Sequence, residues 1–174
     1  MFTESKLTPE IVDELLQREN PGTGRPYTQS EIARMFGVSR QYVSKLRKIG
    51  GVYRSKREKI MDDHWPWQQV PVEQQLALYH VLRAHLEYIA TRGEYMQEWK
   101  LQQLGAFYDR LEENGWIVEH RPDIPPNKYA EYGGFRYTKR KPSDGKLIIR
   151  QNWITNLSDA DRVVWRIPPK RPEF

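Results

Sequence analysis

Residues 28–48 read TQSEIARMFGVSRQYVSKLRK and carry the strongest local folding signals of the 174-residue chain. Thr28 and Glu31 have the spacing of a capping box, in which two residues satisfy each other's free backbone N–H groups at a helix start. Gly37 follows about two turns later, where a sharp turn with positive φ favours glycine. Ser39 then has the side chain of a helix N-cap. The stretch therefore predicts two short helices joined by a tight turn.

The apolar residues of this stretch recur at helical spacing and indicate how the two helices pack. Ile32, Ala33 and Phe36 share one face of the first helix, and Val43 and Leu46 share one face of the second. Apolar faces of this kind are buried against each other. The polar residues of the second helix have no core to enter and are expected to face solvent: Arg40, Gln41, Ser44, Lys45, Arg47 and Lys48.

This pattern is typical of the helix-turn-helix, whose second helix places its N-terminal turn in the major groove of DNA. Arginine pairs bidentately with guanine, and glutamine pairs in the same way with adenine. The start of the first helix offers donors for a phosphate. The alternative is an ordinary helical hairpin with a glycine turn. The expected DNA-binding residues are Thr28, Gln29, Ser30, Ser39, Arg40, Gln41, Tyr42, Ser44, Lys45, Arg47 and Lys48.

The excess positive charge lies entirely in the first third of the chain. Residues 1–60 contain 12 Lys and Arg against 7 Asp and Glu, whereas residues 61–174 contain 16 of each. Residues 40–59 contain eight basic side chains and a single acidic one, Glu58. Such a block attracts a phosphate backbone, because each neutralised phosphate releases counterions. A merely solvated basic surface would have the same composition.

Composition excludes several classes of protein. The chain has no cysteine, which rules out disulfides and thiolate metal sites and favours a reducing cytoplasm. The four histidines do not cluster in the sequence, so we expect no metal site and no cofactor. No apolar run approaches the roughly 18–20 residues of a membrane span. The first four residues do not resemble the start of a secretory signal.

The chain divides into three parts by composition and periodicity. Residues 1–50 are expected to form a compact helical domain. Residues 51–70 follow a glycine and begin with another, and we expect them to be a connector. Residues 71–174 are expected to form a second domain, helical first and then rich in strands.

Helical spacing and β-like runs predict the elements of this second domain. They are helices near 78–89 and 101–113, strands over Trp116–His120, Phe135–Arg140 and Leu147–Arg150, and a short helix after Ser158. The expected fold class is mainly α with a small β portion (α+β), in which a helix-turn-helix domain precedes a helical domain with a short antiparallel sheet. The tail 168–172 contains three prolines and is expected to be extended or frayed.

Three motifs of the second domain carry a resemblance to a known family. They are HWPW at 64–67, GGFRY at 133–137 and SDGKLIIR at 143–150. Together with weaker likeness around 111–126 and 152–157, they resemble the C-terminal half of immunity repressors of temperate actinobacteriophages, of the cluster A mycobacteriophage type. With the helix-turn-helix upstream, the resemblance spans nearly the whole chain.

The resemblance implies a transcriptional repressor in the cytoplasm of a bacterial host, with double-stranded DNA as its partner and no catalytic activity. Such repressors keep lytic genes silent and exclude related phages by occupying an operator and many asymmetric stoperator sites. The family is expected to bind as a monomer, and the chain has no sustained heptad repeat that would form a dimer seam. One copy with two different DNA-facing surfaces would impose no two-fold symmetry on its site.

The second domain is expected to add contacts to DNA. A helix ending at Gly115 and followed by two strands resembles the helix and wing of a winged helix. The wing would carry Arg136, Lys139, Arg140 and Lys141. Alternatively, these are solvated residues of a hairpin whose aromatic side chains fill the core. Two tryptophans of the connector, at 65 and 67, are expected to pack onto the second domain rather than on DNA.

Other functions are weighed against this one. The chain could be another phage DNA-binding protein, such as an excisionase or a terminase small subunit. It could also be a DNA-processing enzyme targeted by its helix-turn-helix, because Glu98-Trp99-Lys100 matches part of a nuclease core. That core needs an earlier aspartate on a strand, and the candidate Asp123 comes later. No Ala-Gly dipeptide occurs for self-cleavage, so we expect no enzyme.

Overall fold

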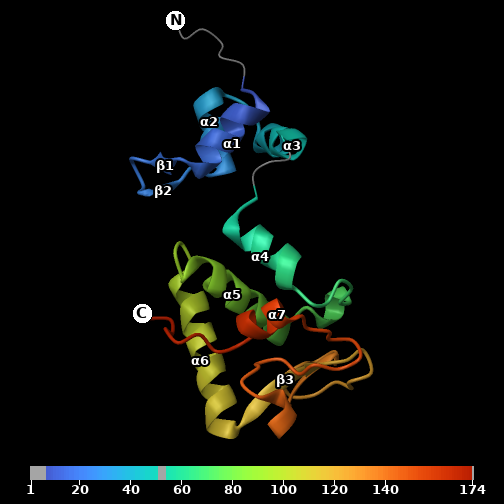
Figure 1. Cartoon of the computed structure of the whole chain (residues 1–174). Coiled ribbons are helices and arrows are strands. Elements are labelled where there is room, and N and C mark those ends of the chain that lie inside the picture. The colour runs from blue at the N-terminus through green and yellow to red at the C-terminus, as the bar shows by residue number, and fades with distance from the viewer. Residues whose placement is uncertain (1–6, 51–53, 174) are drawn as a thin grey trace, which may run out of the picture. The chain divides into compact units, whose positions relative to one another are not determined.

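The computed structural model describes residues 7–50 and 54–173. It divides into two compact units, Met1–Ser55 and Lys56–Phe174 (Figure 1). Within these described residues both units are mainly helical, and each has one two-stranded antiparallel sheet. The α+β fold class expected from the sequence is therefore confirmed. Within the described ranges, no helix has both the length and the apolar character needed to span a bilayer.

The first unit packs three helices around a small apolar core. Val12, Ile32 and Val43 come from three different helices and are fully buried, so the core holds all three together. The elements are α1 (Pro9–Gln17), β1 (Glu19–Asn20), β2 (Arg25–Pro26), α2 (Gln29–Phe36) and α3 (Arg40–Gly50).

The chain between α1 and α2 forms a tight hairpin in which β1 and β2 pair in the antiparallel sense. The carbonyl of Asn20 accepts from the amides of Thr23 and Gly24, and its side-chain oxygen accepts from the Gly22 amide at 2.9 Å. Asn20 therefore satisfies every amide of the turn. The turn therefore depends on a side-chain hydrogen bond, which an Asn-Pro-Gly sequence permits but does not require.

Local signals place α2 as expected. The hydroxyl of Thr28 accepts from the Glu31 amide at 3.2 Å, and the Glu31 carboxylate accepts from the Thr28 amide at 2.7 Å. The helix ends at Gly37, whose φ of 63° lies in the left-handed region. The capping box and the positive φ are both confirmed.

Replacing Gly37 with alanine is expected to destabilise the first unit by about 1–2 kcal/mol, because an L side chain is strained at positive φ. A Cβ at this position would meet no atom within 4 Å, so the cost is conformational and not steric. Chemical denaturation of the full chain measures it. Gly37→Asn, which tolerates positive φ better, should lose less; an equal loss would contradict this explanation.

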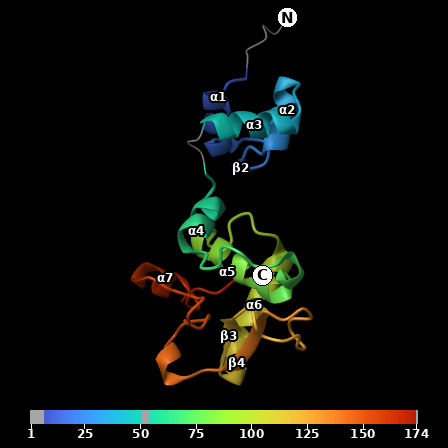
Figure 2. The same ribbon diagram turned by 90° about the vertical axis from the view of Figure 1, so that its right-hand side faces the viewer.

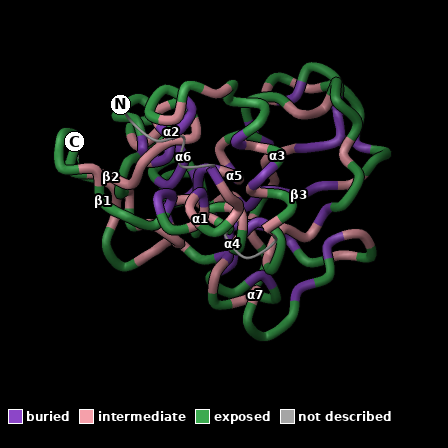
Figure 3. Tube along the Cα trace, turned by 90° about the horizontal axis from the view of Figure 1, so that it is seen from above, coloured by how far each residue is buried: buried purple, intermediate pink, exposed green. Residues whose placement is uncertain are grey.

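The second unit begins with helices and ends with a small sheet and a short helix. In chain order its elements are α4 (Lys56–His64), η1 (Val72–Gln74), α5 (Ala77–Thr91), α6 (Glu98–Asn114), β3 (Trp116–His120), β4 (Phe135–Lys139), η2 (Pro142–Asp144) and α7 (Asp159–Val164). The strands β3 and β4 are antiparallel, with His120 opposite Phe135 and Trp116 opposite Lys139. Four of the five residues of β3 are buried (Figure 3).

The expected third strand, Leu147–Arg150, makes only isolated bridges. Ile149 bridges Val118 in parallel, while Leu147 bridges Arg166 in the antiparallel sense. The segment changes partner after a single residue pair, so no ladder propagates. The short helix after Ser158 is present as α7, and its capping box with Asp161 is formed.

Residues 56–70 differ from the connector expected over 51–70. They form α4 and the segment after it, and they belong to the compact second unit. Salt bridges of Arg57 with Glu87 on α5 (3.5 Å) and of Lys56 with Glu94 (3.6 Å) help to hold α4. The helix is hard to recognise from sequence because its residues are mostly charged. Residues 51–53 of the expected connector lie outside the described residues.

Three tryptophans join distant parts of the second unit. Trp65 and Trp67 lie edge to face with ring centroids 5.0 Å apart, and both contact Trp165 after α7. The indole of Trp67 donates to the Thr155 hydroxyl at 2.8 Å, and that of Trp165 donates to the His64 carbonyl at 3.0 Å. The expectation that Trp65 and Trp67 pack onto the second unit is confirmed.

The C-terminal tail is extended and held in place. The Tyr88 hydroxyl donates to the Lys170 carbonyl at 3.1 Å. Arg171 forms ion pairs with Asp109, at 2.8 Å, and with Glu112 on α6. The extended form agrees with the proline content, whereas these tethers argue against fraying.

Histidine 85 is a fully buried polar group at the centre of the second unit. Its Nε2 donates to the Val164 carbonyl at 2.8 Å, so its Nδ1 accepts from the Tyr108 hydroxyl, also at 2.8 Å. Burial lowers the pKa of His85 to about 4. The folded protein therefore keeps this imidazole neutral at pH values where the unfolded chain protonates it.

The second unit should lose stability as pH falls from about 6.5 towards 4, because the unfolded chain then binds more protons than the folded one. The free energy of unfolding should change by up to about 1.4 kcal/mol per pH unit for this one group. Denaturation of the His85→Gln variant should show a shallower slope. His80→Gln, at an exposed site on the same helix, should keep the original slope; equal slopes in all three proteins would exclude His85.

Candidate nucleic-acid interface

The third helix of the first unit has two sharply different faces. Val43 and Leu46 are buried against α1 and α2, whereas Arg40, Gln41 and Lys45 are exposed. The helix contains five Lys, Arg or Gln side chains and no carboxylate. Figure 2 shows α3 lying across the other helices of its unit. The exposed face of α3 therefore carries positive charge that can attract an anionic partner.

Two predicted site residues act as helix caps. The Ser39 hydroxyl accepts from the Tyr42 amide at 3.1 Å, as the Thr28 hydroxyl does at the start of α2. Hydrogen bonds from the backbone and then the side chain of Thr28 lower the pKa of the Glu31 carboxyl below its usual range. A carboxylate held ionised at the first turn stabilises the helix start. The two caps fix where α2 and α3 begin.

The remaining predicted residues of the first unit lie on accessible surface. Of these, Ser30, Arg40, Gln41, Tyr42, Lys45 and Lys48 are exposed, while Gln29, Ser44 and Arg47 are partly exposed. Tyr42 keeps 44% of its surface exposed, so part of its ring is accessible to solvent. The structure thus brings all the α3 residues expected from the sequence onto one helix, with its base-reading candidates at the N-terminal end.

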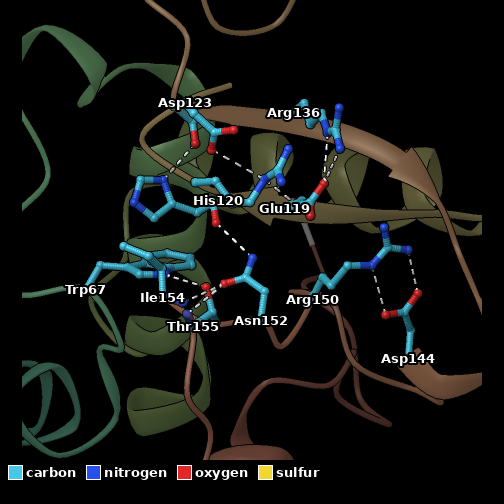
Figure 4. A network of polar contacts seen from close by, with 12 residues as sticks. Trp67, Glu119, His120, Asp123, Arg136, Asp144, Arg150, Asn152, Ile154 and Thr155 are labelled. Atoms are coloured by element: carbon cyan, nitrogen blue, oxygen red, sulfur yellow. Dashed lines mark hydrogen bonds and ion pairs between the residues drawn. The ribbon is translucent and has the colours of Figure 1, made fainter. Parts of the chain in front are cut away.

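The predicted wing residues of the second unit behave differently from one another. Arg136 donates to the Glu119 carboxylate on β3 at 2.8 and 2.6 Å (Figure 4). Arg140 donates to the carbonyls of Leu147 at 2.7 Å, Gly145 at 2.9 Å and Trp116 at 3.2 Å. Both guanidinium groups therefore have partners within the second unit, although 40% of the Arg136 side chain remains exposed.

The lysines of this group are more accessible. Lys139 is exposed and donates to the Asn114 carbonyl at 2.9 Å, and Lys141 is exposed. The register places Lys139 opposite Trp116, next to the end of α6. The basic residues therefore do not lie at the loop that joins β3 to β4, where the tip of a wing would be.

One relative places the chain in a family. No family model matches the sequence. The chain is 33% identical over 144 residues to the "Repressor-like immunity protein" of Mycobacterium phage L5, and the match covers 82% of this chain and 78% of the relative. The chain belongs to the actinobacteriophage immunity repressors. The resemblance drawn from the sequence motifs is thereby confirmed.

The SDGKLIIR motif of this immunity repressor has a structural explanation. Arg150 donates to both carboxylate oxygens of Asp144, at 3.1 and 2.7 Å, and to the Lys139 carbonyl at 2.7 Å. The Asp144 carboxylate also accepts from the Lys141 amide at 2.6 Å and its pKa is lowered, although burial opposes the lowering. The pair thus positions the segment that carries Lys139 and Lys141. Sequence reasoning missed it, because the two side chains meet across the turn that follows η2, and helix or strand periodicity does not reveal contacts across a turn.

The structure does not arrange the nuclease-like residues of the sequence as a nuclease core would need them. Glu98 begins α6, and Lys100 on the same helix forms an ion pair with Glu87 at 3.3 Å, so the nuclease-like triplet is not on a strand. Among the described residues, no group of three or more His, Asp or Glu is arranged to hold a metal ion. As a family member, the protein is a regulator of the repressor type.

Proposed function

We propose that this protein represses transcription by binding duplex DNA, with α2, the turn at Gly37 and α3 acting as a helix-turn-helix. The observation that carries the proposal is the exposed, carboxylate-free face of α3, which begins at a capped N-terminus and lies opposite buried Val43 and Leu46. A helix of this kind fits the major groove, where its first turn reaches base edges.

The proposed contacts follow from position on α3. Arg40 and Gln41, in the first turn, read bases. Ser44 and Lys45, one turn later, reach bases or flanking phosphates. The first turn of α2 holds a phosphate through its free backbone N–H groups and the side chains of Gln29 and Ser30. The remaining basic residues of α3, Arg47 and Lys48, add phosphate contacts.

The second unit is proposed to contact the DNA backbone through Lys139 and Lys141. Arg136 and Arg140, which the sequence grouped with them, are committed to Glu119 and to backbone carbonyls, so their role is to shape this surface. Phosphate contacts of this kind would fix the register of α3 without reading sequence. One copy with two unlike surfaces would bind an asymmetric site as a monomer.

The biological role proposed is maintenance of lysogeny and superinfection immunity in the bacterial cytoplasm. The repressor would act by occupancy of operator and stoperator sites, with no cofactor and no catalysis. Its relative from phage L5 is named as an immunity protein, which supports this role.

Footprinting of the purified full chain on fragments of a phage genome tests the proposal. We expect discrete protected sites without two-fold symmetry, and an affinity that falls steeply with salt because several phosphates are contacted. Uniform weak protection of all fragments at moderate salt would contradict specific recognition. Palindromic sites would contradict the monomer.

A further inference from the structure

An open pocket of about 240 Å³ lies in the second unit between α5, α6 and β4. Leu78 and Val81 on α5 and Phe107 on α6 give it apolar walls, and Tyr129 and Tyr137 also line it. Pockets for drug-sized molecules usually measure roughly 300–1,000 Å³. The volume therefore suits a smaller ligand with an apolar body.

The guanidinium group of Arg110 lines this apolar pocket. The guanidinium carbon of Arg110 lies 5.7 Å from the ring centroid of Tyr129 and 5.9 Å from that of Tyr137. Two acidic neighbours on α6, Asp109 and Glu112, are engaged by Arg171 instead. In the part of the chain that the structure describes, no carboxylate forms an ion pair with Arg110. Its charge is thus held beside the pocket and is not neutralised.

The aromatic wall that positions Arg110 is preorganised. Tyr137 stacks on Trp116 with ring centroids 5.3 Å apart, and Tyr129 meets Tyr137 edge to face at 4.8 Å. Rings packed in this way have little freedom to rotate. An arginine that stacks on such a wall loses less freedom when it binds an anion than an arginine extended into solvent.

We propose that this pocket binds a small amphipathic anion, whose anionic head pairs with Arg110 and whose apolar body lies between α5 and α6. A purely apolar ligand would leave the charge of Arg110 unused, and a bare inorganic anion would leave the apolar walls exposed to water. The site is separate from the proposed DNA-reading face of α3 and does not depend on DNA binding.

Titration of the full chain with three simple probes tests the proposal. Hexanoate carries both features, hexan-1-ol only the apolar body, and acetate only the anionic head. Amide signals of Ala77 and Ala106, which line the pocket, report binding by NMR. We expect hexanoate to saturate near a Kd of about 1 mM, and each control to bind about tenfold more weakly. Equal binding of hexan-1-ol, or no saturable shift with hexanoate up to about 20 mM, would overturn the proposal.

Variants separate the pocket from a general effect of charge. Arg110→Gln should bind hexanoate about tenfold more weakly. Arg83→Gln is the matched control, because Arg83 also lies over two rings, Trp65 at 5.5 Å and Tyr79 at 5.6 Å, but does not line the pocket. It should bind as the unmodified protein does. Full affinity in Arg110→Gln, or an equal loss in Arg83→Gln, would remove the assigned role.

Filling the pocket gives an independent check. Ala106 is an exposed residue of the pocket wall, so Ala106→Phe should fold normally, as its amide spectrum would verify. We expect this variant to lose saturable hexanoate binding even though Arg110 is still present. Unchanged binding would place the ligand elsewhere and overturn the assignment.

Discussion

Arg40→Ala is expected to weaken binding to the cognate duplex by about 1–3 kcal/mol and to relax the base preference at one position of the site. Arg40 is exposed in the first turn of α3, where a guanidinium can pair with the O6 and N7 of guanine. Fluorescence anisotropy on the cognate duplex and on single-base variants measures both effects. The same loss on random DNA would mean that Arg40 contacts phosphate and does not read a base.

Arg18→Ala is the matched control for this experiment. Arg18 is exposed and directly precedes β1, and Figure 1 shows the β1–β2 hairpin and α3 at opposite sides of the first unit. Its loss removes the same charge from the same unit. We expect a change below about 0.5 kcal/mol in specific binding. A loss as large as that of Arg40→Ala would indicate a diffuse electrostatic effect and would contradict the placement of α3 in the groove.

Trp165→Ala is expected to destabilise the second unit by about 3–5 kcal/mol, the largest stability effect that we predict. Trp165 is fully buried, stacks on His85 with ring centroids 5.3 Å apart and donates to the His64 carbonyl. Its removal leaves a cavity and an unpaired carbonyl at the meeting point of α4, α5 and α7. Differential scanning calorimetry should show a large loss in the transition of the second unit.

Trp153→Ala provides the comparison, because Trp153 lies in the same unit but keeps 75% of its surface exposed. Its change in unfolding free energy should stay within about 0.5 kcal/mol. Similar losses in the two variants would mean that the buried tryptophan cluster does not hold the unit together.

Prediction from sequence succeeded where the interacting residues are close in the chain. The start of α2 depends on Thr28 and Glu31, its end on Gly37, and the start of α7 on Ser158 and Asp161. Each of these signals spans at most four residues, so the sequence alone specifies it. The set of exposed residues on α3 follows in the same way, because helical periodicity separates them from the two buried positions.

The sequence by itself determined the helix pair, its exposed basic face and the family to which the chain belongs. Only the tertiary structure decided which basic residues of the second unit are available. Arg136 is bound by Glu119, which is 17 residues away, and Arg140 by carbonyls up to 24 residues away. Periodicity carries no information about such partners, because they meet only when strands and loops pack. For the same reason α4, whose residues look like a linker, and the pocket beside Arg110 emerge only from the folded chain.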